Sequence, residues 1–508
     1  VEVVVPRPPV CTARGDDCLV DRLPPQLGRD SQPLAELNAV SPDADGVVPV
    51  TLWNTSNRRH SQAALTPIAS LATEVVVQDR RPADGPMRGY AQLDEDQRKL
   101  VDSVKLDPQK RLNPEQRVRA RDLVSEFVDV FAPDPKNPTH THVMEVKLPL
   151  KPDAVPHRHA PSKLGPEGQK IVDKHIDEME SRGIIRKSNS AWASRVVLVK
   201  KKDGSIRFCV DLRDTNSKLK WLDSPIPLTA DAIDRLASGQ GSIDSLFLST
   251  MDLASGFWCL PIAEDAKEIT SFVTHRGKYE FNYLPFSIQS GPSYMCRLMD
   301  AVLEGLAWEI CMPYLDDVAT WSTGTNQSSF EAREQESFEQ HLKRLRLILE
   351  RFRWAQLSCK AEKCEFFATS AAYLGHVVSR RGLEMDPKKV EAVSKIDPTT
   401  IDTLEKVRSF LGLCSYYRKF IDKFATKAGP LHDLTKDGVD VSVISQSDAC
   451  QNAIRELISA ITTEPVLAMP RFDRDFIVQT DAAITEGIGG VLSQHDDEKR
   501  ERVNAYYG

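Results

Sequence analysis

Apolar residues recur at helical spacing in two stretches of the chain. Between residues 338 and 352 they lie three or four positions apart, which predicts an amphipathic helix that packs this face against a core. Residues 164–183 show the same spacing, and Pro166 near the start and Gly183 at the end favour a helix bounded there. Residues 402–427 also predict a helix, basic in character, with Asp402 and Glu405 spaced as in a capping box.

Short apolar runs that end in turn residues predict strands. Residues 196–199 and 206–210 flank the turn dipeptide Asp203-Gly204, which predicts a hairpin. The run 246–251 ends at Asp252, and the run 476–480 ends at Asp481. Because these strands alternate irregularly with the helices, the fold class indicated is α+β.

A second hairpin is predicted around two adjacent carboxylates. Apolar residues 310–312 and 318–321 flank the sequence Tyr314-Leu315-Asp316-Asp317. A bare Asp-Asp pair is most often an exposed turn, and Asp496-Asp497 is typical of one. Within an apolar strand-turn-strand, however, two adjacent carboxylates are costly to bury without a cation.

The first 95 residues differ from the rest. They are rich in Pro, Asp and Arg and weakly periodic, which favours a linker with one small β-rich piece near residues 47–53 and 73–77. The chain does not begin with Met, so we interpret it as a fragment or a processed piece. Neither a signal peptide nor a run of 18 apolar residues is found, so we expect no membrane span.

Composition narrows the classes further. The 508 residues predict three or four domains, and 41% hydrophobic content is enough to build cores. The ten cysteines show no zinc spacing, which favours free thiols in a reducing compartment. A net charge of −7 argues against a uniformly basic nucleic-acid binder.

The charge of one segment, in contrast, is compatible with binding to nucleic acid. Residues 182–207 hold eight Lys or Arg and a single acid, Asp203. Phosphate contacts could concentrate there, although a solvated basic face explains the same pattern equally well.

The three aspartates suit phosphodiester synthesis. That reaction needs a primer 3′-hydroxyl to be deprotonated and aimed, and the charge on a leaving pyrophosphate to be neutralised. Two divalent ions held by a few carboxylates can do both. Asp316 and Asp317 would supply two carboxylates, and Asp252, at the end of another apolar strand, could complete the set.

The motifs as a whole resemble the reverse transcriptases of gypsy-type long-terminal-repeat retrotransposons, over residues 95–508. The matching segments are 192–194, 196–204, 211–213 with Asn216, 251–257, 284–286 with Pro292, 314–317, 373–376 and 409–421. The resemblance implies a right-hand polymerase with fingers, palm and thumb. It implies an RNA-directed DNA polymerase that extends a primer on an RNA or DNA template.

Roles follow from the resemblance position by position. Asp252, Asp316 and Asp317 would hold two Mg²⁺ ions, or Mn²⁺, with help from the Leu253 carbonyl. The other implied roles are triphosphate binding by Lys201 and Arg207, a steric gate against ribose at Phe257, packing near the templating pair at Phe286, a primer grip at Leu374, Gly375 and His376, and protonation of pyrophosphate by Lys363 or Lys360.

The end of the chain resembles the opening strands of the family's ribonuclease H, with Asp481 as a first metal ligand. One ligand cannot build a two-metal site, so we expect no ribonuclease H activity. The expected segments are a linker or post-protease region at 1–95, a pre-fingers segment at 96–160, fingers and palm at 161–395, thumb and connection at 396–465, and an incomplete ribonuclease H-like piece at 466–508.

Departures from the family keep an alternative open. Ser287 stands where the family has Gly, and Pro313 lies inside a predicted strand, where it removes a backbone donor. Prolines usual in the fingers are replaced by Lys187, Ala191 and Arg195. The alternative is a catalytically silent relic that binds nucleic acid. A nucleotide cyclase is disfavoured by the basic fingers hairpin.

The expected partners are a template–primer duplex and deoxynucleoside triphosphates, with no membrane. A homodimer and a partner cut from the same polyprotein both stay open. The family expectation for location is cytoplasmic particles, which the residues themselves do not reveal.

Overall fold

The computed structural model describes four short strands before residue 89 and most of the chain after it. The undescribed positions after residue 88 are 135–138, 201–203, 205, 223, 225–226, 238–242, 255, 325–328, 437–446, 464–465, 472–473, 484–486, 497 and 508. The chain forms two compact units, Val1–Arg88 and Gly89–Gly508, which we describe separately.

The first unit contains two antiparallel strand pairs. β1 (Glu2–Val5) pairs with β3 (Val48–Thr51), and β2 (Val20–Arg22) pairs with β4 (Ala69–Leu71). The strand predicted near residues 47–53 is therefore present. The piece predicted at 73–77 lies outside the described residues.

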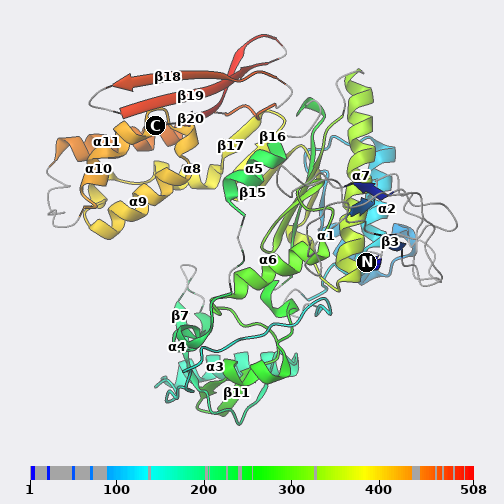
Figure 1. Cartoon of the computed structure of the whole chain (residues 1–508), viewed down its shortest axis with the longest axis vertical. Helices are drawn as coiled ribbons and strands as arrows, with labels where there is room; N and C mark the ends of the chain where they lie inside the picture. The colour runs from blue at the N-terminus through cyan, green and yellow to red at the C-terminus, as the bar shows by residue number, and fades with distance from the viewer. Residues whose placement is uncertain are drawn as a thin grey trace, which may run out of the picture. The chain divides into compact units, whose positions relative to one another are not determined.

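A five-stranded sheet in the second unit contains β9 and β13, the strands that end and begin at Asp252 and Asp317 (Figure 1). Its strands in spatial order are β12 (Cys311–Tyr314), β13 (Asp317–Ser322), β9 (Phe247–Asp252), β14 (Glu365–Ala368) and β5 (Lys105–Leu106). β9 and β13 are almost entirely buried, as expected for central strands made of apolar runs. Both hairpin partners predicted around Asp316-Asp317 are confirmed.

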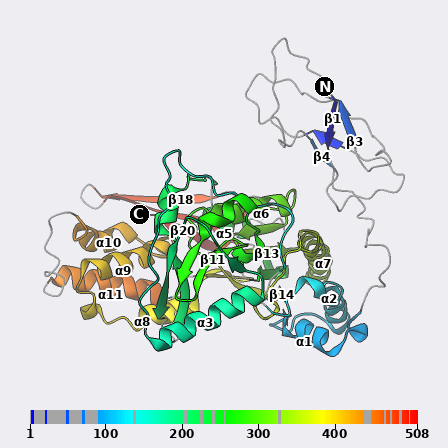
Figure 2. The same ribbon diagram turned by 90° about the horizontal axis from the view of Figure 1, so that it is seen from below.

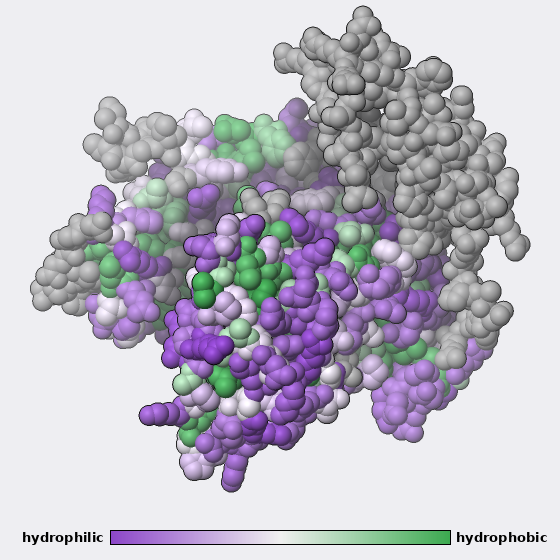
Figure 3. Space-filling view, turned by 60° about the horizontal axis from the view of Figure 1, so that its bottom comes forward, coloured by the Kyte–Doolittle hydropathy of each residue, from purple (hydrophilic) through white to green (hydrophobic). Residues whose placement is uncertain are grey.

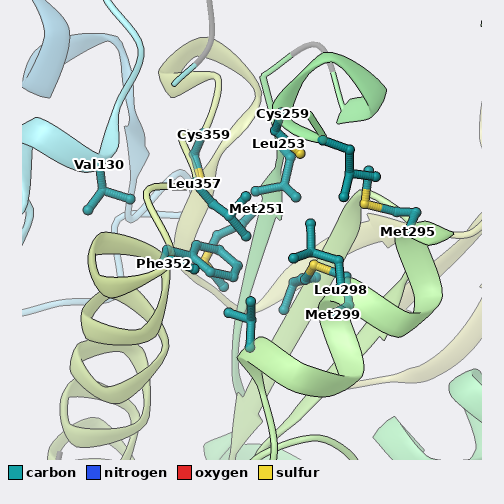
Figure 4. Packing of buried hydrophobic residues seen from close by; sticks show 14 of the residues in the cluster. Val130, Met251, Leu253, Cys259, Met295, Leu298, Met299, Phe352, Leu357 and Cys359 are labelled. Carbon is teal, nitrogen blue, oxygen red and sulfur yellow. The ribbon is translucent and has the colours of Figure 1, made fainter. Parts of the chain in front are cut away.

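Two helices build the core beneath these strands. α6 (Gly291–Val302) supplies Met295, Leu298 and Met299, and α7 (Phe330–Trp354) supplies Phe352. Figure 4 shows these side chains gathered around Met251 of β9. The residues that flank Asp252 in sequence are thus anchored in a close-packed interior.

A second five-stranded sheet lies within the segment expected to contain the fingers. Its order is β6 (Ile185–Lys187), β11 (Gly277–Phe281), β10 (Phe272–Thr274), β7 (Ser194–Lys200) and β8 (Ile206–Asp211). The predicted hairpin is the β7–β8 pair. The predicted helix at 164–183 is α3 (Pro166–Ser181), which begins at its proline and is followed by Gly183 at a φ of 67°.

Helices and two small sheets complete the second unit. The sheets are β15 (Ser370–Tyr373) with β16 (His376–Ser379) and β17 (Gly382–Met385), and β18 (Ile477–Ala483) with β19 (Gly487–His495) and β20 (Glu501–Tyr507). The remaining α-helices are α1 (Glu95–Ser103), α2 (Pro114–Glu126), α4 (Arg213–Lys218), α5 (Thr229–Ala237), α8 (Pro387–Ser394), α9 (Leu404–Tyr416), α10 (Phe424–Asp433) and α11 (Asp448–Thr462). Short 3-10 turns are η1 (Tyr90–Gln92), η2 (Val128–Val130), η3 (Ile243–Ser245), η4 (Gly256–Cys259), η5 (Glu264–Thr270), η6 (Ala361–Lys363), η7 (Pro398–Thr400) and η8 (Arg418–Phe420).

The single helix predicted at 402–427 was wrong. The chain forms α9 and α10 there, separated by a turn in which Lys423 has a φ of 51°. The predicted capping box was wrong too, because Thr403 is the N-cap residue and its side chain accepts a hydrogen bond from the Lys406 amide. Asp402 instead pairs with the Lys406 ammonium at 2.7 Å.

Helix α2 packs along α7, and the two lie side by side in both ribbon views (Figure 2). Paired ionic contacts join them. Arg119 reaches Glu339 at 2.6 Å, and Arg346 reaches Glu126 at 2.7 Å. Segment 96–160 therefore contacts the helix that backs the central sheet.

The surface of the described chain is mixed. The face drawn in Figure 3 is mainly hydrophilic and carries several separate apolar patches. Within the part that the structure describes, no helix has both the length and the apolar character to cross a membrane.

A buried histidine links α7 to both central strands. His341 lies 2.7 Å from the Ser249 hydroxyl of β9 through Nε2 and 3.1 Å from the Ser322 hydroxyl of β13 through Nδ1. Burial, with a smaller contribution from Arg344, lowers the pKa of His341 to about 3. The ring is therefore neutral at physiological pH, and each ring nitrogen has a hydroxyl partner.

This ring makes stability depend on pH. In the unfolded chain a histidine takes up a proton near pH 6.5, whereas folded His341 stays neutral down to about pH 3. Stability should therefore fall as pH drops through that window. Between pH 6.5 and 5.0, wild type should lose about 2 kcal/mol more unfolding free energy than His341→Gln. Urea unfolding at several pH values measures this, and parallel profiles would contradict it.

Candidate active site

The three aspartates lie at one end of the two central strands. β9 and β13 are antiparallel, and their register sets Asp317 directly opposite Asp252. The Leu253 amide donates to the Asp316 carbonyl at 3.0 Å, which ties the hairpin turn to the end of β9. The backbone thus places Asp252 and Asp317 on adjacent strands, with Asp316 in the adjoining turn.

Asp316 lies in a tight two-residue turn between β12 and β13. Tyr314 pairs with Asp317, so Leu315 and Asp316 form a two-residue loop, and Leu315 has a φ of 55°. A side chain at positive φ is strained, a feature that recurs at functional sites. A Cβ at Gly256 would lie 3.3 Å from the Asp316 Cβ, so this glycine lets the segment after Asp252 approach the turn.

The three carboxylates affect the ionisation of Asp317. Burial, followed by the charges of Asp316 and Asp252, raises the pKa of Asp317 to about 6. Such repulsion is expected where acids gather without a cation. The donor chemistry, oxygen ligands of high charge density, is what hard divalent cations prefer.

Two lysines form ion pairs with Asp252, one with each carboxylate oxygen. The Lys360 and Lys363 ammonium groups lie 2.8 and 2.9 Å from the two oxygens of Asp252. Asp252 raises the pKa of Lys363 by accepting its hydrogen bond. In the conformation described, no group of three or more acidic, histidine or cysteine side chains among the described residues could hold a metal ion.

An aromatic group lies beside the carboxylates. Phe257 and Phe286 meet edge to face with ring centroids 5.6 Å apart, and the Arg207 guanidinium lies 5.9 Å from the Phe286 ring centroid. Three predicted nucleotide-site residues from distant parts of the sequence thus come together. Lys201, predicted with them, lies outside the described residues.

Sequence reasoning missed one member of this group. Trp258 packs against Phe286 at 5.8 Å, and its only signal was its place next to Phe257. A Cβ at Gly291 would lie 3.4 Å from the Phe257 ring, so α6 begins close against that ring.

Asn216 fixes the loop that follows Phe286. Its side-chain nitrogen donates to the Ser287 carbonyl at 2.8 Å, and its oxygen accepts from the Gln289 amide at 3.0 Å. Ser287 itself has a φ of 78°, a conformation that suits glycine. Pro313 lies on β12, which is the edge strand of its sheet, where a missing backbone donor is tolerated.

The remaining predicted residues lie in two other places. Leu374 and Gly375 form the β15–β16 turn, with φ values of 46° and 69°, and burial lowers the pKa of His376 to about 4. Asp481 lies on β18, exposed, 3.3 Å from Lys423.

Comparisons with known proteins agree with this geometry. Residues 199–378 match the family described as "Reverse transcriptase (RNA-dependent DNA polymerase)", and residues 447–508 match "RNase H-like domain found in reverse transcriptase". The chain is 34% identical over 340 residues to the "Retrovirus-related Pol polyprotein from transposon gypsy" of Drosophila melanogaster. It is 31% identical over 399 residues to that from transposon opus of the same organism.

These matches cover 64% and 76% of this chain but only 31% and 37% of the relatives. The chain thus spans about a third of the length of those polyproteins.

Among solved structures, the foamy viral protease-reverse transcriptase in complex with dsDNA is similar with a TM-score of 0.65 and 18% identity, covering 81% of this chain and 79% of that one. The same protein with an RNA/DNA hybrid gives a TM-score of 0.62 and 16% identity, covering 94% of this chain and 61% of that one. At such identity the likeness shows the fold alone. It confirms the predicted α+β right-hand polymerase with an RNase H-like piece.

The conformation of Ser287 leads to a test. Ser287→Gly should raise the unfolding free energy by about 1 kcal/mol, because glycine adopts positive φ without a Cβ clash. Ser290→Gly is the matched control, since Ser290 has a φ of −82° and should gain nothing. Urea unfolding of both variants measures the difference, and an equal change at the two positions would contradict the assignment of strain to Ser287.

Proposed function

This chain is a reverse transcriptase segment of the gypsy-type retrotransposon kind, and from that premise we propose that it extends a primer 3′-hydroxyl on an RNA or DNA template. The observation that supports this most is the pairing of Asp252 with Asp317 across β9 and β13, with Asp316 in the adjoining turn. The activity is that of a nucleotidyltransferase that uses deoxynucleoside triphosphates.

Asp252, Asp316 and Asp317 would hold two Mg²⁺ ions, or Mn²⁺, with the Leu253 carbonyl as a further ligand. Bound there, divalent ions supply charge neutralisation and activation of the primer hydroxyl. The fit rests on the register that sets Asp317 opposite Asp252, with Asp316 in the adjoining turn, and on the oxygen chemistry of these three side chains. Because Asp252 is bound by two lysines, those ammonium groups must move aside when a cation takes their place.

The lysines and Arg207 have roles of their own in this proposal. Lys363, or Lys360 beside it, would donate a proton to the departing pyrophosphate, since both ammonium groups reach Asp252. Arg207 would bind a triphosphate oxygen through its forked donors, held near the site by its contact with Phe286. Phe257 would act as the steric gate, because its ring would limit the space beside the 2′ position of the incoming nucleotide's sugar.

A template–primer duplex is the partner we propose. The foamy viral enzyme similar in fold was solved in complex with dsDNA and with an RNA/DNA hybrid. The basic β7–β8 hairpin would contact phosphates, with Arg195 and Arg207 exposed on it.

A catalytically silent relic is the alternative that Ser287 raised, because Ser stands there where the family has Gly, and the family matches do not favour it. Pro313, on an edge strand, no longer argues for it. Primer extension separates the two candidates.

Asp316→Asn should abolish extension of oligo(dT) on poly(rA) with magnesium. A lost metal ligand removes several kcal/mol of transition-state stabilisation, so the rate should fall by at least about a hundredfold. Asp402→Asn, at an exposed ion pair of the thumb, is the control and should retain activity. Folded wild-type protein that binds the duplex but extends nothing would favour the silent relic.

Phe257→Ala should admit ribonucleotides, because removing the ring opens space beside the sugar 2′ position. The ratio of kcat/KM for dNTP over rNTP should fall by at least about tenfold, the scale of one lost steric contact. Trp258→Ala, which removes a neighbouring ring, tests whether loosening the packing of these rings is enough to lower the ratio. An unchanged ratio in Phe257→Ala would refute the gate.

A further inference from the structure

Two tyrosine hydroxyls from helix α9 bind the turn between β15 and β16. The Tyr416 hydroxyl donates to the Leu374 carbonyl at 2.5 Å, and the Tyr417 hydroxyl donates to the Gly375 carbonyl at 2.6 Å. Both carbonyls belong to residues at positive φ, the backbone conformation of a tight two-residue hairpin turn. Adjacent residues of one helix thus hold adjacent residues of one turn.

The contact is close on every side. A Cβ at Gly375 would lie 3.3 Å from the Tyr416 hydroxyl, and the φ of 69° is one that L side chains rarely adopt, so a larger residue would be strained there. The His376 ring packs against the rings of Tyr416, Tyr417 and Phe420, with centroids 5.2, 5.3 and 5.7 Å away. The turn is therefore joined to α9 and the residues after it by hydrogen bonds and ring contacts.

The other end of the turn is tied to the catalytic hairpin. The Tyr373 hydroxyl, buried, donates to the Met312 carbonyl of β12 at 2.9 Å. β12 pairs with β13, which carries Asp317. Three consecutive residues, 373 to 375, thus join the hairpin of the carboxylates to helix α9.

We propose that Tyr416 and Tyr417 are positioning residues that hold the Leu374–Gly375 turn, and with it the primer end, at a fixed place relative to the carboxylates. This inference rests on the proposed polymerase function and on the expected primer-gripping role of the turn. Small displacements of a reacting group reduce rates strongly, so a turn fixed at both ends serves the alignment of a 3′-hydroxyl. We call the two tyrosine hydroxyls and the turn they bind the tyrosine clamp. Through it, the position of α9 would set the position of the primer end relative to the carboxylates.

The experiment removes the hydroxyls and keeps the rings. Tyr416→Phe and Tyr417→Phe should each raise the KM for template–primer about fivefold, while the KM for dNTP stays within about twofold, because one hydrogen bond is lost at the primer side only. Tyr90→Phe is the matched control, since that hydroxyl bonds Asp102 at 2.6 Å in another part of the unit. Combined with Tyr373→Phe, the effects should be less than additive, because all act on one turn.

A second measurement does not depend on catalysis. Hydrogen exchange of the amides at residues 370–379 should speed up at least about fivefold in both variants and stay unchanged in Tyr90→Phe. Faster exchange with a higher template–primer KM supports the clamp. An unchanged KM in an active, folded Tyr416→Phe protein overturns it while leaving the polymerase proposal intact. Should wild type extend no primer, the proposed function fails, and unchanged exchange would then overturn the clamp on its own.

Discussion

The antiparallel register of β9 against β13 is the constraint on which the site depends. A shift by one residue would turn every side chain of a strand to the opposite face and separate Asp252 from Asp317. Two features oppose such a shift. Met251 and Leu253, on either side of Asp252, are buried among residues of the central core, and His341 contacts one serine on each strand. The hydrophobic core and one polar bridge therefore fix the geometry of charged groups at the strand ends.

That geometry has an electrostatic cost that shapes the rest of the site. Burial and then the charges of Asp316 and Asp252 raise the pKa of Asp317, and Lys360 and Lys363 offset part of the negative charge at Asp252. The same negative charge favours divalent cations, which replace many weak interactions by direct ligation. Phe257 and Phe286 gather with Arg207 of β8, and the turn that α9 holds through Tyr416 and Tyr417 is joined to β12 through Tyr373.

Local pattern was enough to predict the β7–β8 and β12–β13 hairpins, because an apolar run beside turn residues specifies its own pairing, and it also predicted β9 and β18. The strands of the other hairpins, apart from β18, were not predicted. Local pattern failed at residues 402–427, where α9 ends at Tyr416 and a 3-10 turn, the extended Ile421 and the left-handed Lys423 precede α10. The roles of the site residues came from resemblance to a family, since no spacing in the sequence reveals that Asp252 and Asp317 share a register. Contacts made only in three dimensions, such as the lysines on Asp252 and the hydroxyls of Tyr416 and Tyr417 on a distant turn, carried no local signal.

Metal binding tests the central claim most directly. Wild-type protein, bound to a chain-terminated primer on its template with the matching dNTP, is titrated with Mn²⁺ and free Mn²⁺ is followed by electron paramagnetic resonance. The account predicts about two tightly bound ions per chain in wild type, and loss of tight binding in Asp317→Asn. Equal Mn²⁺ binding by wild type and variant would show that these carboxylates do not share the ions, and would contradict the account.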